Sequence, residues 1–405
     1  MPYILMIIRC FCRVLPVFGL MALAGLSTSA LALDIEVLYL QQKIEKPPVL
    51  SNILPEPPDS GKRGAELAII DNNTTGRFLG QNYQLSVFES ADAALLVDTA
   101  TDWVRQGNFL ILLDLPAETL LKLARTPGIV GEAILFNISA TDDRLRHDQC
   151  ISGLLHTIPS RAMKTDALMQ FLVRKRWQNW FLIQAGKPED AAFASSMKRA
   201  SKRYGGKLIA EKSWTFDTDQ RRTAQLEIPG FSQVDDYDIT IVADEAGDIG
   251  EYILFNTWRA RPVAGTQGLQ PLAWHRVVEQ WGAAQLQSRF IELSGRWMNS
   301  QDYAAWLALR SIGEAVTRSE SPTVSQVYAY LLSDKFQLAG FKGRKLSFRD
   351  WNGQMRQPIP LVHPRALVSV SPQEGFLHPF SELDTLGFDR PEVNCQFKTR
   401  LSEKS

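Results

Sequence analysis

Short apolar runs alternate with amphipathic segments along most of this chain. Residues 108–115, NFLILLDL, are apolar over most of their length, which is typical of a strand buried on both faces of a sheet. Residues 116–125 follow with helical spacing, a proline in the first turn and Glu118 close behind it. Because such strand and helix pairs repeat through short turns, the pattern predicts an α/β fold with a parallel sheet.

The same alternation begins again after residue 160. Helical spacing over 164–177 leads into an apolar strand at 179–186, and a further helix at 188–204 ends at a Gly-Gly pair. Another apolar strand at 236–248 runs into acidic residues. We therefore expect two Rossmann-like α/β lobes in tandem, each with its own parallel sheet.

The first 32 residues have a different pattern. Arg9 and Arg13 precede an apolar run, and Ala30-Leu31-Ala32 fits the small-residue cleavage pattern of export signals. We predict that 1–32 is a signal peptide that is removed; an uncleaved membrane anchor is the alternative. An exported mature chain keeps two cysteines, Cys150 and Cys395, which are expected to pair in an oxidising compartment. The alternative is a buried free thiol and a loose C-terminal tail.

Composition and charge exclude several classes of protein. The 405 residues are 45% hydrophobic and carry 44 basic against 44 acidic side chains, so the chain has no basic field for nucleic acid. The five histidines are scattered, and the sequence contains no paired-histidine metal motif, nucleophile elbow or phosphate-binding loop. We therefore expect neither an enzyme nor a nucleic-acid partner.

Polar and acidic residues gather where the predicted strands end. In open parallel sheets, ligands bind beyond the carboxyl ends of the strands, so two facing lobes would place these residues along one cleft. The candidate ligand-binding residues are Asp114, Glu118, Ser139, Ala140, Thr141 and Asp142 in the first lobe and Asp244, Glu245 and Gln267 in the second.

The carboxylates at the strand ends also suit a hard cation, since Ca²⁺-like ions take about six to eight oxygen ligands. The candidate ligands for calcium or a lanthanide are Asp142, Asp143, Asp244 and Asp248. The alternative is that these acids cap the helices that follow them or remain solvated. No loop has the D-x-[DN]-x-[DN]-G spacing of a compact calcium site, and no other cofactor is expected.

Four segments resemble a known family. They are GAELAIIDNNTTGRFLGQNYQL (64–85), ISATDDRL (138–145), AGTQGL (264–269) and DYAAWLALRSIGEAV (302–316). Together they resemble the type I periplasmic solute-binding proteins, in particular the leucine/isoleucine/valine-binding receptors of ABC importers. The resemblance implies a monomer in the periplasm that binds a small solute between two hinged lobes. It also implies delivery of that solute to the permease and ATPase subunits of an inner-membrane importer.

The resemblance further implies how the chain is divided. The family's hinge has several crossings, so lobe 1 would comprise 33–143 with 292–335, and lobe 2 would comprise 144–291 with 336–380. The tail, 381–405, would then cross lobe 2, with Cys150 placed for a bridge to Cys395. Two more segments resemble receptors associated with alcohol oxidation that depends on pyrroloquinoline quinone (PQQ). They are DALMQFLVRKRWQNWFLI (166–183) and FRDWNGQMRQPIPLV (348–362).

The candidate site departs from the family at two points. Ser139-Ala140-Thr141 matches the turn that holds a ligand carboxylate, but Asp114-Leu115-Pro116 replaces the Ser/Thr-rich turn that should assist it. Proline removes a backbone donor, and carboxylates repel an anion. Gln267 stands where the family has a glutamate for the ligand's ammonium, so the charge-assisted part of that bond is lost.

An ordinary α-amino acid is therefore not the expected solute. We expect the binding component of an importer linked to PQQ-dependent alcohol catabolism. A receptor for a hard cation is one alternative, and a branched-chain-amino-acid-type receptor or a ligand-sensing module is the other.

Overall fold

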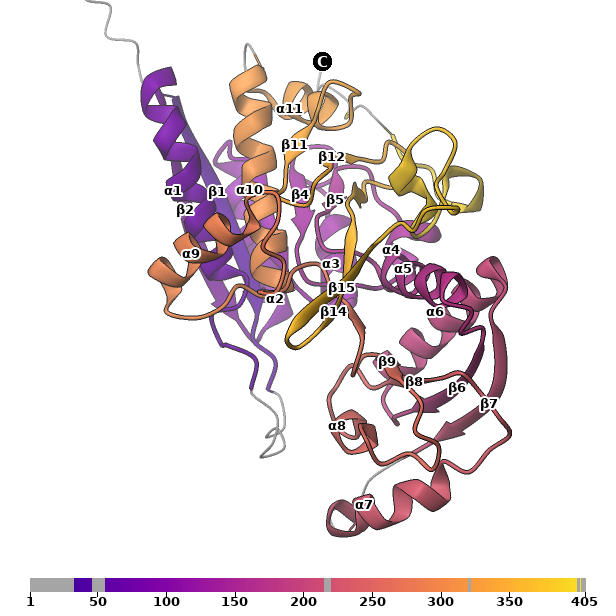
Figure 1. Cartoon of the computed structure of the whole chain (residues 1–405). Helices are drawn as coiled ribbons and strands as arrows, with labels where there is room; N and C mark the ends of the chain where they lie inside the picture. Colours follow the sequence, from indigo (N-terminus) through magenta and orange to yellow (C-terminus); the bar gives the residue numbers. More distant parts are fainter. Residues whose placement is uncertain (1–32, 46–54, 215–219, 320–321, 399–400, 402–405) are drawn as a thin grey trace, which may run out of the picture.

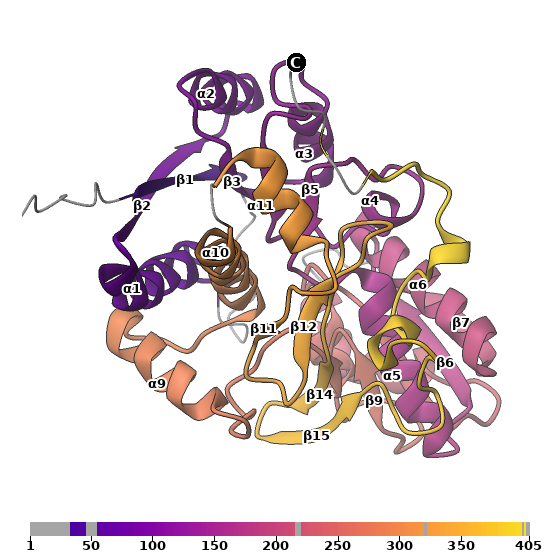
Figure 2. The ribbon, with the colours of Figure 1, turned by 90° about the horizontal axis from the view of Figure 1, so that it is seen from above.

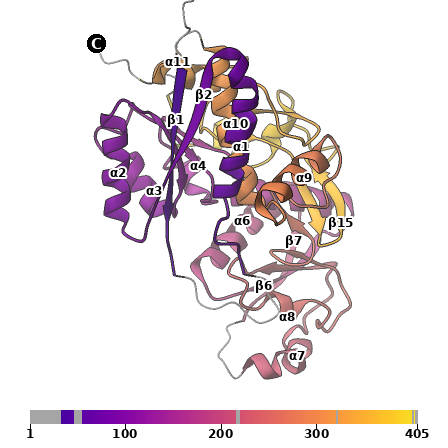
Figure 3. The ribbon, with the colours of Figure 1, turned by 90° about the vertical axis from the view of Figure 1, so that its left-hand side faces the viewer.

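The computed structural model describes residues 33–45, 55–214, 220–319, 322–398 and 401. The predicted signal peptide, 1–32, lies outside these residues. Within the described part, no helix is both long enough and apolar enough to cross a membrane. The described chain forms two α/β units, which lie one beside the other (Figure 1 and Figure 3).

The first unit is built on a five-stranded parallel sheet with the strand order β2-β1-β3-β4-β5. Its strands are β1 (Leu33–Gln42), β2 (Gln81–Ser90), β3 (Leu110–Asp114), β4 (Ile134–Asn137) and β5 (Leu154–His156). Successive residues face two different cores: Val37 and Tyr39 face one, and Leu38 and Leu40 face the other. Both faces are thus covered, which explains the continuous apolar runs in the sequence.

Helices cover the two faces of this sheet (Figure 2). One face carries α1 and α10 with α9 beside them, and the other carries α2 and α3. Their bounds are α1 (Lys62–Leu79), α2 (Ala93–Arg105), α3 (Ala117–Ala124), α9 (Ala283–Ser294) and α10 (Ser300–Arg318). Gly64 permits the close packing of α1 on α10, because a Cβ at that position would collide with the backbone of Asp302.

The second unit has a four-stranded parallel sheet with the order β7-β6-β8-β9. Its strands are β6 (Asn179–Gln184), β7 (Lys207–Ser213), β8 (Ile239–Ala243) and β9 (Val263–Gly265). Its helices are α5 (Arg161–Arg174), α6 (Pro188–Tyr204), α7 (Gln220–Phe231) and α8 (Gly250–Ile253). The two sheets confirm the predicted fold class of two α/β lobes with parallel strands.

Several crossings connect the two cores. The chain passes to the second unit between β5 and α5, and after β10 (Gln270–Pro271) it returns to α9 and the first core. It crosses again between β13 and β14. The remaining elements are α4 (Arg144–His147), α11 (Val324–Leu331), β11 (Leu338–Ala339), β12 (Lys345–Phe348), β13 (Met355–Arg356), β14 (Ile359–His363) and β15 (Ala366–Ser371).

Some elements lie in a different unit from the one expected. β5 pairs with β4 and α9 packs in the first core, although 144–291 was assigned to lobe 2. β11 to β13 also contribute to the first core, through Leu338, Leu346 and Met355. These strands have two to four residues each, so they are too short to give a periodic signal that would reveal their side of the hinge.

The C-terminal tail is fastened to both units. It contains two short 3₁₀ helices, η1 (Glu382–Thr385) and η2 (Arg390–Glu392), and the predicted disulfide between Cys150 and Cys395 is present, with a Cα–Cα distance of 5.8 Å. On the second unit, the Gly387 N–H donates to Asp166 at 2.8 Å. On the first unit, Leu401 is buried in the core. The tail therefore spans the two units, rather than crossing lobe 2 alone.

Candidate functional site

A cleft of about 1420 Å³ lies where the first sheet faces the second unit. Turns at the carboxyl ends of β3 and β4 line one side, and the start of α5 and the first residues of α6 line the other. Six of the predicted residues line this cleft: Asp114, Glu118, Ser139, Ala140, Thr141 and Asp142. The second unit contributes four residues that were not predicted: Arg161, Pro188, Glu189 and Ala192.

The turn after β4 is shaped by Asn137, the last residue of that strand. Its Oδ1 accepts the backbone N–H groups of Ser139 at 3.2 Å and Ala140 at 2.9 Å, and its Nδ2 donates to the Ala140 carbonyl at 2.8 Å. A side chain that bonds its own following backbone is a common way to fix a turn. Two of the turn's N–H groups are thereby used inside the protein.

Arg146 holds the same turn from behind. The side chain is fully buried, and its Nη1 donates to the carbonyl oxygens of Ala140 at 2.8 Å and Asp142 at 3.0 Å. Nη2 donates to Ile158 at 3.1 Å, and Nε donates to Gln354 at 2.9 Å. Burial lowers the pKa of Arg146 to about 9. Because Ile158 lies between β5 and α5 and Gln354 directly precedes β13, Arg146 links the turn to the segments next to the chain crossings.

Asp114 ends β3 at the edge of the cleft. Its Oδ2 accepts Gln41 Nε2 at 2.7 Å and the Tyr39 hydroxyl at 3.2 Å. Burial raises the pKa of Asp114 above its ordinary value, although bonds from Ser139, Gln41 and Tyr39 oppose the rise. All of these donors are uncharged, and no cation of the described residues forms an ion pair with this carboxylate.

Arg161, the first residue of α5, joins the two units across the cleft. Its backbone N–H donates to the Thr141 carbonyl at 3.0 Å, and its Nη1 lies 3.6 Å from Asp142. Its Nε and Nη2 both donate to Glu245 Oε2, at 2.9 and 2.6 Å. Glu245 is thus connected to the cleft through Arg161, and it is not itself among the lining residues.

Asp244 and Gln267 lie away from the cleft, contrary to prediction. Asp244 is buried, and its two oxygens accept the backbone N–H groups of Asp248, Ile249 and Gly250 at 2.6 to 2.9 Å. It therefore satisfies the orphan donors at the start of α8. Gln267 packs against Gly250, where an added Cβ would meet its side chain.

The predicted cation site is not formed. Asp143 accepts the Ala162 N–H at 2.8 Å at the start of α5, and Asp248 pairs with Lys187 at 2.9 Å. Across the described residues, no three His, Cys, Asp or Glu side chains come together in a way that could hold a metal ion. The hypothesis of a calcium or lanthanide site at Asp142, Asp143, Asp244 and Asp248 was therefore wrong, because Asp143 and Asp244 serve helix starts and Asp248 forms an ion pair.

Aromatic side chains were another possible source of ligand contacts. None of the cleft's described lining residues is Phe, Tyr or Trp. Trp214 and Trp274 are buried in the cores, whereas Trp258 is more than half exposed and lines a separate hollow of about 600 Å³ beside β9. Recognition in the cleft therefore depends on polar groups and on short aliphatic ones.

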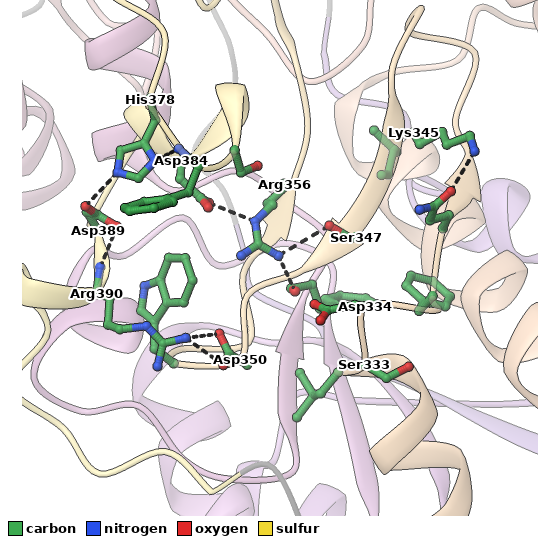
Figure 4. A pocket seen from close by; sticks show the side chains of 18 of the residues that line it. Ser333, Asp334, Lys345, Ser347, Asp350, Arg356, His378, Asp384, Asp389 and Arg390 are labelled. Atoms are coloured by element: carbon green, nitrogen blue, oxygen red, sulfur yellow. Dashed lines mark hydrogen bonds and ion pairs between the residues drawn. The ribbon is translucent and has the colours of Figure 1, made fainter.

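A second hollow of about 1000 Å³ lies between α11, β12 and the tail (Figure 4). Four of its charged side chains form two ion pairs: Arg356 with Asp384 at 2.8 Å, and Arg390 with Asp350 at 2.6 Å. The guanidinium groups of both arginines also lie over the ring of Trp351, at 5.0 and 4.9 Å. Since these arginines and aspartates already pair with one another, we interpret them as contacts that fasten the tail to the first unit.

Sequence reasoning missed Arg146 and Arg161. Arg146 follows the end of β4 by nine residues and Arg161 follows the end of β5 by five, and the sequence around each is typical of an ordinary helix start. For Arg146, the only available signal was its position a few residues after the candidate turn, and this signal is weak.

Known proteins share the two-unit α/β fold of this chain. Residues 58–225 match the family model described as periplasmic binding protein. No curated protein matches the sequence.

Solved structures with the same fold come from several bacteria. A periplasmic binding protein from Burkholderia mallei superposes with a TM-score of 0.65 at 15% identity, covering 89% of this chain and 98% of its own. An ABC transporter substrate-binding protein from Sphaerobacter thermophilus gives 0.67 at 14%, covering 88% and 100%. A leucine-, isoleucine-, valine-, threonine- and alanine-binding protein from Brucella ovis, in a closed conformation, gives 0.64 at 12%, covering 90% and 98%. At such identities the likeness concerns the fold.

Proposed function

We propose, from the type I periplasmic binding fold of this chain, that it is the solute-binding component of an ABC importer. One observation carries the proposal: turns at the strand ends of the first unit and the start of α6 in the second line a single cleft. This is the position at which open α/β sheets bind ligands. Asp114, Ser139, Ala140, Thr141 and Asp142 are the residues that we propose to contact the solute from the first unit.

The proposed mechanism is closure of two hinged units on the solute. A solute that touches both the turn after β4 and the start of α6 is bound better when the units are close, so it shifts the population toward the closed form. Arg161 assists this closure, because it already contacts Thr141 and Asp142 from the second unit. A membrane permease would then recognise the closed form.

The finer parts of the proposal rest on sequence. Export through 1–32 would place a monomer in the periplasm, beside the permease and ATPase subunits of the importer. The link to PQQ-dependent alcohol catabolism is supported by the resemblance of segments 166–183 and 348–362. A receptor of the branched-chain-amino-acid type is favoured only by Ser139-Ala140-Thr141, and Asp114-Leu115-Pro116 opposes it.

A thermal-shift screen of small solutes tests the function. A bound solute raises Tm in proportion to the logarithm of its concentration, and small-angle scattering should then show compaction of the protein. Ala192 lines the cleft from α6, so Ala192→Trp should abolish both effects. Ser195→Trp on the exposed side of the same helix is the matched control and should leave them intact. Equal binding by both variants would place the solute site outside the cleft.

A further inference from the structure

We infer that the cleft selects a solute that carries a primary or secondary ammonium group and no carboxylate. This inference rests on the proposed function and adds the chemical class of the solute.

The basic side chains of the cleft are already paired. Lys43 lies 2.7 Å from Glu89, and Arg144 lies 2.7 Å from Glu118. Arg161 is held by Glu245 at 2.6 Å. A carboxylate on the solute would have to displace one of these partners, since the described lining residues include no other Lys or Arg.

Several backbone N–H groups of the cleft already form hydrogen bonds within the protein. The N–H groups of Ser139 and Ala140 bond to Asn137, and Pro116 has none. Three helices begin at the cleft: α3 and α6 carry Glu118 and Glu189 in their first turns, and at the start of α5 the carboxylate of Asp143 already accepts the Ala162 N–H. These acids face the positive helix ends that would otherwise attract an anion.

Asp114 is a carboxylate of the cleft that has no cationic partner among the described residues. It is a partly buried carboxylate that lines the cleft, and its donors in the protein, Gln41, Tyr39 and Ser139, are all neutral. A carboxylate has about four lone-pair sites, so it can accept an N–H from a solute in addition to these. An ammonium would give Asp114 the charge-assisted bond that the described residues do not supply.

The described lining residues include no aromatic side chain, and this indicates which kind of cation the cleft can bind. Quaternary ammonium groups are recognised by aromatic faces, and none lines this cleft within the described residues. Primary and secondary ammonium groups carry N–H donors and bind carboxylates directly. The expected solute is therefore an amine with donors, such as an amino alcohol or a diamine, rather than a choline-like ion.

Isothermal titration of the purified protein tests this inference with five probes: ethanolamine, 1,4-diaminobutane, choline, leucine and butyrate. We expect binding of ethanolamine or 1,4-diaminobutane at least tenfold tighter than binding of choline, leucine and butyrate. Asp114→Asn should weaken amine binding at least tenfold. Asp98→Asn removes an exposed carboxylate on α2, outside the cleft, so it is the matched control and should change binding less than threefold.

Two outcomes would overturn the inference in different ways. Preferred binding of leucine or butyrate would show that the cleft accepts a carboxylate, and the receptor function would stand. Amine binding that is unchanged in Asp114→Asn, with the variant folded by circular dichroism, would remove Asp114 from recognition. If the Tm screen finds no solute of any class, the receptor function itself fails.

Discussion

The guanidinium of Arg146 lies 2.8 Å from the carbonyl oxygen of Ala140, and this bond fixes the turn that lines the cleft to the crossing segments behind it. Its other acceptors are likewise uncharged oxygen atoms, on Asp142, Ile158 and Gln354. A buried arginine that serves carbonyl groups is replaced poorly by any other side chain, because each lost donor leaves a buried acceptor unsatisfied.

Replacement of Arg146 should therefore cost both stability and binding. We expect Arg146→Lys to lower the free energy of unfolding by about 3 kcal/mol, since an ammonium cannot reach all four acceptors. Urea denaturation measures this change, and solute affinity in the folded fraction should also fall. Arg144→Lys, two positions before Arg146 and at a more exposed site, is the control and should cost under about 1 kcal/mol.

Replacement of Asp244 tests whether its side chain caps a helix or binds a metal ion. Asp244→Ala leaves three backbone N–H groups at the start of α8 without their acceptor, so stability should fall by about 2 kcal/mol. Addition of EDTA or of calcium should leave the Tm of the unaltered protein unchanged. A rise in Tm with calcium that disappears in Asp244→Ala would contradict this assignment.

Reduction of the disulfide should destabilise the protein strongly. The bridge closes a loop of 245 residues, for which the chain-entropy model gives about 5 kcal/mol. The double variant Cys150→Ser/Cys395→Ser should therefore have a markedly lower Tm than the oxidised protein. Thiol titration of the unfolded, unreduced protein should find no thiol at Cys150 or Cys395.

Stability should also fall as the pH is lowered, because of His156. Burial and the nearby charge of Arg146 hold the pKa of His156 well below its ordinary value of 6.5. The unfolded chain takes up a proton as the pH falls through 6.5 while the folded chain does not, so the free energy of unfolding decreases below that pH. His156→Gln should flatten the dependence of Tm on pH between 7 and 5, whereas His363→Gln, at an exposed position, should retain it.

The fold was predictable from sequence where an element is long enough to show a clear pattern of apolar residues. The runs that became β3, β6 and β8 are buried on both faces, so their apolar character shows in the sequence. The short strands β5 and β11 to β13 carry no such signal, and their places follow from tertiary packing. The division of the hinge was therefore predicted less well than the sheets.

The candidate site was predictable on one side of the cleft. Asp114 and Ser139 follow neighbouring parallel strands, so one geometric rule places both at the same edge. Asp244 also follows a strand, but its side chain turns back to cap the next helix, and the sequence does not show which of the two outcomes an acid takes. Arg161 reaches the cleft from a helix that starts after a crossing, and no spacing rule covers that geometry.

The pairing of Cys150 with Cys395 has a consequence for production of the protein. Cys150 must stay reduced while the ribosome makes the 244 residues that separate it from Cys395, which include all of the second sheet. During that time an exposed thiol can react with the thiol of another molecule instead. Low expression levels and a thiol–disulfide isomerase should therefore raise the yield of correctly bridged protein.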